Sequence, residues 1–255
     1  MLNDTAIPYR CANICTVVRR LATTPLRPSW IGSPGRMQNT FANEAFLDEL
    51  MALAGKDPLD VRLESIYDPR GVEVLARVAH LSGWRTGPRP DPRADLAVGL
   101  AYVHYELSRT YVAGVAQVEV TQSTGQVQVR RVFVAHDCGQ IINPNGTRNQ
   151  IEGNVIQTVS RVLKERVTFD RKRVTSLDWS TYPILTFPEV PDVVIDLIRS
   201  AGHGAARGRR ALGRDRARRG RECDPRCRGD PRAVGALHAR ESPGRTATSM
   251  RQADN

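Results

Sequence analysis

Long apolar runs, aromatic residues and paired cysteines are scarce in this chain of 255 residues. No stretch approaches the ~18 consecutive apolar residues of a membrane span, and the opening MLNDTAIPYR does not have the pattern of a signal peptide. Cys11 with Cys15 and Cys223 with Cys227 are the two close pairs among five cysteines, and their spacing differs from that of zinc knuckles. These absences predict no membrane span and no metal site, and they leave both a cytoplasmic and a periplasmic location open.

The charge of the chain is concentrated at one end. Residues 201–255 contain fourteen arginines and six acidic residues but no Lys, Phe, Tyr, Trp or Ile, so they carry +8 of the +10 formal charge. Nucleic-acid binding is one alternative for this segment, because arginines neutralise phosphates. The missing aromatic residues leave base stacking without support. We therefore expect a disordered, Arg-rich tail over residues 201–255 and do not expect nucleic acid as a partner.

Residues 36–84 have the pattern of three successive helices. Asp57-Pro58 and Asp68-Pro69 are start signals, because Asp caps a helix and Pro at the first position gives up an N–H that has no helical partner. Gly55 and Gly83 follow the apolar-periodic segments as helix-ending residues. The first part of the chain is therefore predicted to be helical.

Residues 85–97 are rich in proline and are the expected connector to a second segment, residues 98–198. In that segment apolar residues alternate or cluster in short runs at 100–107, 111–120, 127–134 and 193–198. One break in the alternation, at Arg130-Arg131, indicates a strand that twists or bulges there. Meandering strands with packed helices predict an α+β (mixed α/β) fold for residues 1–200.

The stretch from Val132 to Arg161 is predicted to form a strand, a turn and a helix. Turn residues at 143–146 place the helix start near Thr147, with Asn145 or Thr147 as the cap. Polar groups beside the unbonded N–H groups of a helix start suit an anionic ligand, and an ordinary crossover helix has the same pattern. One face of the helix should point into a core, because apolar residues recur at helical spacing at Ile151, Val155, Val159 and Val162.

Three separated motifs carry a family resemblance: SPGRMQNTFANEAFLDELMALAGKDPLDVRL, VAHDCGQIINPNGTRNQIEGN and SLDWSTYPI. Over residues 5–198 the chain resembles the C-terminal part of the large, molybdopterin-binding subunit of the xanthine dehydrogenase and aldehyde oxidase family. The resemblance is greatest to the branch of the isoquinoline 1-oxidoreductase β-subunit. It implies a partial molybdopterin-binding domain from an oxidoreductase that hydroxylates N-heterocycles or aldehydes with oxygen from water.

The resemblance also implies a cofactor, partners and site residues. Gln150 matches the family glutamine that hydrogen-bonds the pterin, and Glu152 and Gly153 match its supporting turn, while Asn154 stands where the family has a second glycine. The implied cofactor is molybdenum-molybdopterin, in its cytosine dinucleotide form. The implied partners are a 2Fe-2S small subunit, the missing upstream part of the large subunit and a small-molecule substrate.

The catalytic base of the family is not found in this chain. The resemblance places it in a Gly-x-Gly-Glu-Pro motif just after Ile198, and no such motif follows. Residues 209–217, back-translated with GC-rich codons and read one base later, give Gly-Glu-Pro-Ser-Gly-Ala-Ile-Ala. We therefore name no catalytic residue and expect an out-of-frame tail and a fragment that is inactive alone. The alternatives are a basic nucleic-acid-binding protein and a degenerate, non-catalytic protein.

Overall fold

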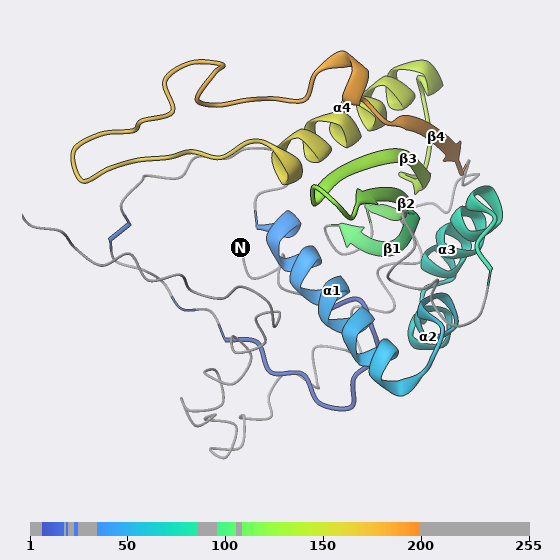
Figure 1. The fold of residues 1–255 in the computed structure, drawn as a ribbon. Coiled ribbons are helices and arrows are strands. Elements are labelled where there is room, and N and C mark those ends of the chain that lie inside the picture. The colour runs from blue at the N-terminus through green and yellow to red at the C-terminus, as the bar shows by residue number, and fades with distance from the viewer. Residues whose placement is uncertain are drawn as a thin grey trace, which may run out of the picture. The chain divides into compact units, whose positions relative to one another are not determined.

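Three helices precede the sheet in the computed structural model, which describes residues 7–17, 19, 23–24, 35–85, 96–105 and 109–198 (Figure 1). The side chain of Asp57 accepts hydrogen bonds from the first turn of α2, and that of Asp68 does the same for α3. Gly55 and Gly83 adopt left-handed φ angles of 64° and 65° and end the first and third helices. The helix predictions are thus confirmed, with bounds α1 Arg36–Ala54, α2 Pro58–Ser65 and α3 Pro69–Ser82.

In the part of the chain that the structure describes, four strands form one sheet in the order β1-β2-β3-β4. The first three are an antiparallel meander, and β4 pairs in parallel with β3. Gln117 pairs with Arg131 and Val118 pairs with Val129, so Arg130 is the extra residue of a bulge, as predicted. The bounds are β1 Leu96–Tyr105, β2 Thr110–Thr121, β3 Gln126–Asp137 and β4 Asp192–Leu197. Helices and strands in one unit confirm the α+β class.

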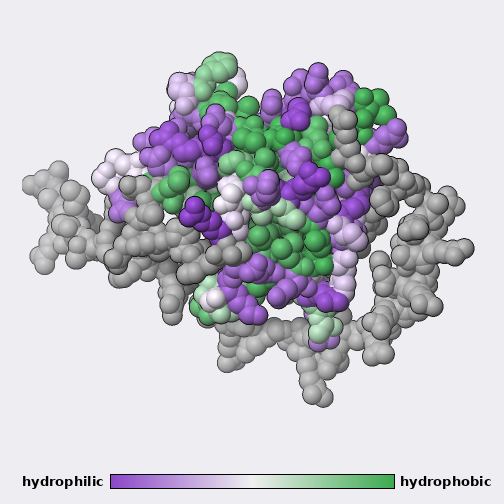
Figure 2. Space-filling view, turned by 90° about the vertical axis from the view of Figure 1, so that its right-hand side faces the viewer, coloured by the Kyte–Doolittle hydropathy of each residue, from purple (hydrophilic) through white to green (hydrophobic). Residues whose placement is uncertain are grey.

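The main core lies between α3 and one face of the sheet. Val74, Leu75 and Val78 of α3 are fully buried and belong to one cluster with strand residues such as Val115 and Phe133. Burying each such side chain stabilises the fold by ~1.5–3 kcal/mol. Figure 2 views the molecule from the side on which α2 and α3 lie in Figure 1. Apolar residues remain exposed among polar ones on this side.

A buried ionic cluster joins Tyr9 to the helices and the sheet. Arg62 of α2 has no exposed side-chain surface and pairs with Glu44 at 3.0 Å and with Asp48 at 2.9 Å, both on α1. Glu44 also accepts hydrogen bonds from the Tyr9 hydroxyl at 2.7 Å and from the Tyr102 backbone N–H of β1 at 2.8 Å. This cluster offsets the cost of burying an arginine and fixes α1 and α2 against the sheet.

The helix after β3 differs from its prediction at both ends. α4 spans Pro144–Leu163 and therefore begins three residues before Thr147. Its cap is Asn143, whose side chain accepts from the backbone N–H of Gly146, because Pro144 takes the first helical position. Val162, expected in the core, is 70% exposed. Most of the predicted connector, residues 86–95, and the predicted tail, 201–255, lie outside the described residues.

Candidate functional site

α4 lies on the connection between the parallel strands β3 and β4, together with the short helix η3 (Phe187–Glu189). Phe133 and Ala135 of β3 belong to the α3 core, so Val134 between them faces the other side of the sheet, where it is 5% exposed. Arg148 of α4 donates to the backbone oxygen of Ile195 in β4 at 3.0 Å. The start of α4 is therefore fixed beside the carboxyl ends of β3 and β4.

Asp137, the last residue of β3, is held in place by an arginine from α3. Its carboxylate is 1% exposed and accepts two hydrogen bonds from Arg70, from Nε and Nη2, each at 2.7 Å. The pKa of Arg70 is raised chiefly by this hydrogen bonding. Asp137 also accepts from the backbone N–H of Gly139 at 2.8 Å. The carboxylate thereby fixes the first residues of the turn that leads to α4, a role that the sequence did not reveal.

A tyrosine extends this anchor to the middle of the sheet. The hydroxyl of Tyr111, on β2, donates to Asp68 at 2.6 Å, and the guanidinium of Arg70 lies 4.3 Å from the centre of the Tyr111 ring. Asp68 is the residue that caps α3. The start of α3, the end of β3 and the turn before α4 therefore form one connected unit.

The three residues implied by the family resemblance all lie in α4, and all are exposed. Glu152 and Gly153 thus belong to a continuous helix, which corrects the expectation of a supporting turn. Residues two apart on an α-helix point about 200° apart, whereas residues three apart are neighbours. Gln150 and Gly153 therefore share one side of α4, and Glu152 points to the opposite side.

Gly153 has no packing reason to be glycine among the described residues. It adopts no left-handed φ, and a Cβ built on it would meet no atom within 4 Å apart from the adjacent backbone of its own helix. A glycine inside a helix costs up to ~1 kcal/mol relative to alanine. Gly153 therefore leaves the backbone of α4 open to a close approach on the side that carries Gln150.

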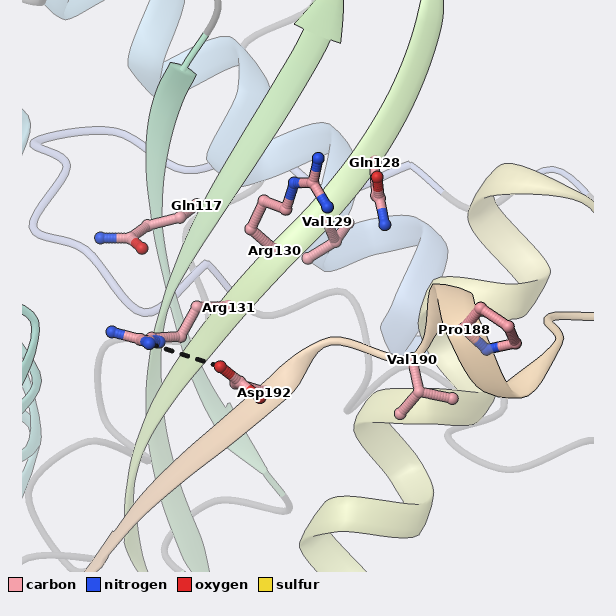
Figure 3. A pocket seen from close by; sticks show the side chains of 8 residues that line it. All are labelled: Gln117, Gln128, Val129, Arg130, Arg131, Pro188, Val190 and Asp192. Atoms are coloured by element: carbon pink, nitrogen blue, oxygen red, sulfur yellow. Dashed lines mark hydrogen bonds and ion pairs between the residues drawn. The ribbon is translucent and has the colours of Figure 1, made fainter.

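A surface pocket of ≈ 340 Å³ lies beside β3, the start of β4 and η3 (Figure 3). It is near the end of α4 rather than its start, because the Ser160 hydroxyl of α4 accepts from Leu185 N just before η3. Arg131 pairs with Asp192 at 3.3 Å, and Arg130 pairs with Glu119. The two arginines that line the pocket are thus already neutralised by carboxylates. The pocket is lined by Gln117, Gln128, Val129, Arg130, Arg131, Pro188, Val190 and Asp192.

The cysteine and histidine at the end of β3 do not form a reactive pair. Burial raises the pKa of the Cys138 thiol and lowers the pKa of the His136 imidazole, although Asp137 partly opposes the second shift. Cys11 and Cys15 are exposed free thiols. Among the described residues, no group of three His, Cys, Asp or Glu side chains is placed to hold a metal ion, and no helix is long and apolar enough to cross a membrane.

Comparison with known proteins identifies the domain that contains α4. A family model described as the molybdopterin cofactor-binding domain matches residues 80–191. A nicotinate dehydrogenase subunit from Pseudomonas putida is 42% identical over 187 residues, which are 69% of this chain and 16% of that protein. The β-subunit of isoquinoline 1-oxidoreductase from Brevundimonas diminuta is 33% identical over 167 residues, which are 65% of this chain and 21% of that protein.

Among solved structures, quinoline 2-oxidoreductase from Pseudomonas putida 86 aligns with a TM-score of 0.35 and 29% identity, over 37% of this chain and 12% of that one. The chain spans less than a quarter of the length of the two curated relatives above. It belongs to the molybdopterin-binding xanthine dehydrogenase and aldehyde oxidase family, and it contains part of the cofactor-binding domain of that family.

Proposed function

We propose that this chain supplies one wall of the molybdenum-molybdopterin site in an oxidoreductase that hydroxylates N-heterocycles or aldehydes. The observation that carries the proposal is the side of α4 on which Gln150 and Gly153 are exposed together. This side lies inside the region that matches the cofactor-binding domain. When bound, the molybdenum cofactor supplies the oxidation of the substrate carbon, with the oxygen coming from water.

The residues on this side of α4 fit a pterin. The Gln150 amide offers two N–H donors and an acceptor, which match the mixed donors and acceptors of a pterin edge. Gly153 has no side chain, so a flat ring can come close to the backbone of the helix. Glu152 points to the other side of α4, and we assign it a supporting contact with protein rather than with the cofactor.

The finer assignments follow from the same proposal. The cofactor is the cytosine dinucleotide form, and the partners are a 2Fe-2S small subunit and the missing upstream part of the large subunit. The two curated relatives are both named as subunits, which makes them parts of larger enzymes. The chain alone is inactive, because no Gly-Glu-Pro base motif follows Ile198.

The tail is part of this proposal. An Arg-rich segment without Phe, Tyr, Trp or Ile has little with which to build a core. A one-base shift in a GC-rich back-translation of residues 209–217 gives a Gly-Glu-Pro string. Sequencing the gene across the codons for residues 190–215 tests the reading frame. An extra or missing base supports the proposal, and an intact frame that encodes the tail as printed contradicts it.

Cofactor binding is tested by complementation. The chain is co-expressed with the part of the P. putida nicotinate dehydrogenase subunit that lies outside the aligned region, and molybdenum and pterin are measured in the purified complex. Gln150→Ala should lower the cofactor content about fivefold or more, because it removes hydrogen bonds worth ~1 kcal/mol or more. Gln126→Ala, at an exposed glutamine of β3 outside α4, is the matched control. Equal cofactor content in both variants contradicts the proposal.

A further inference from the structure

The connection from α4 to β4 contains a long segment whose shape comes from local hydrogen bonds. We call residues 166–190 the arm (Figure 1). Phe169 and Val174 form an isolated antiparallel bridge, and the turn between them is closed by a hydrogen bond from Asp170 N to Arg173 O at 2.9 Å. The Asp178 carboxylate then accepts from the backbone N–H of Thr181 at 3.0 Å. The backbone conformation of the arm is therefore fixed by hydrogen bonds within the arm, without contact with another surface.

The arm exposes large apolar side chains to solvent. Phe187 is 96% exposed, Trp179 is 74% exposed and Leu177 is 71% exposed, and Phe169 is half exposed. Local hydrogen bonds fix the backbone beside them, so these side chains are held outward at little further cost in conformational entropy. Exposed apolar groups gathered in one segment are typical of a protein contact surface.

Residues 199–255 lack the large apolar side chains that could cover the arm. Residues 199–255 contain no Phe, Tyr or Trp, and their only Ile, Leu and Val residues are Leu212, Val234 and Leu237. A second copy of the chain is less suited, because a symmetric contact with the tips of the two arms on the axis would bring Arg171, Lys172 and Arg173 of each copy together. Like charges at such a contact repel.

More than three quarters of the length of each curated relative lies outside the region that this chain matches. We infer that the arm docks onto the part of the large subunit that this chain lacks, on an apolar surface bordered by carboxylates. The apolar side chains supply the buried area, and the basic turn at residues 171–173 selects the acidic border. This inference rests on the proposed function, because the missing part is defined by the relatives.

Docking is measured with the full 255-residue chain, without any cofactor. The probe is the part of the P. putida nicotinate dehydrogenase subunit outside the aligned region, and the readouts are the dissociation constant and amide hydrogen exchange. Wild-type chain should bind, and exchange in residues 166–190 should slow. Trp179→Ser with Phe187→Ser should weaken binding about tenfold or more, since exposed aromatic anchors dominate such contacts. Both positions are exposed, so the variant should keep the wild-type circular dichroism spectrum.

The control replaces exposed apolar residues outside the arm, with Leu53→Ser and Val17→Ser, and should bind within about twofold of wild type. Absence of wild-type binding overturns the inference. Equal binding by the arm variant and the control, or an arm that mediates only self-association, also overturns it. If the chain docks through the arm here but the co-expressed, purified complex contains no molybdenum, the proposed function is refuted and the docking inference stands.

Discussion

Replacing Asp137 with alanine should destabilise the fold more than any surface ion-pair change. The substitution removes two hydrogen bonds of 2.7 Å with Arg70 and one of 2.8 Å with the backbone N–H of Gly139. Breaking a buried ion pair by removing one partner costs ~3–5 kcal/mol. Water reaches the Arg70 side chain, which is 27% exposed, so the lower end of that range applies. We expect the free energy of unfolding to fall by about 3 kcal/mol.

Urea unfolding followed by circular dichroism measures this loss, and amide exchange shows where it acts. Exchange should accelerate in the turn after Asp137 and in the first turn of α4, since Asp137 fixes Gly139. The matched control is Asp196→Ala, because Asp196 pairs with Arg77 at 3.3 Å on an exposed surface. Such pairs contribute ~0–1 kcal/mol. If Asp137→Ala lies within about 1 kcal/mol of the control, the anchor contributes no more than a surface pair and the reasoning is wrong.

Three further predictions concern a close contact, a carboxylate and a thiol. Gly71→Ala should destabilise the chain by ~1–3 kcal/mol in urea unfolding, because its Cβ would lie 2.5 Å from a tyrosine hydroxyl of β1. Hydrogen bonds from Ser180 and Thr181 lower the pKa of Asp178 from 3.8 to about 2. This stabilisation of the arm is therefore present above pH 4 and lost as the pH falls through 2; a carboxyl ¹³C titration midpoint near 3.8 would contradict it. Iodoacetamide should alkylate Cys138 more slowly than exposed Cys11, because burial raises the pKa of the Cys138 thiol. Peptide mapping checks this, and equal rates would refute it.

The parts of the fold that depend on neighbouring residues were predictable from the sequence. Asp57-Pro58 and Asp68-Pro69 start helices through local capping, and the break at Arg130-Arg131 is a bulge in the observed pairing. The start of α4 was placed too late because Asn143, directly before Pro144, is the better cap. Local capping chemistry thus identified the elements and misplaced one boundary.

The parts that depend on distant residues were not predictable. Arg70 and Asp137 are 67 positions apart, and Tyr9 and Glu44 are 35 apart, so no local pattern indicates either contact. Gln150 and Gly153 were found through the family motif, not through spacing, and only the helix geometry separates them from Glu152. The exposure of Val162 was not predictable either, because it depends on how far the sheet extends along α4, and helical spacing does not give that length.

The most direct test of the cofactor-binding wall is the molybdenum content of complexes that contain Gly153→Ala. Among the described residues, no atom beyond the adjacent backbone of α4 lies within 4 Å of the new Cβ, so alanine should stabilise the chain alone by up to ~1 kcal/mol through helix propensity. In the complex with the remainder of the nicotinate dehydrogenase subunit, the same methyl group should block the approach of the pterin. We expect a more stable chain whose complex holds less than about a tenth of the wild-type molybdenum. An unchanged molybdenum content would contradict it.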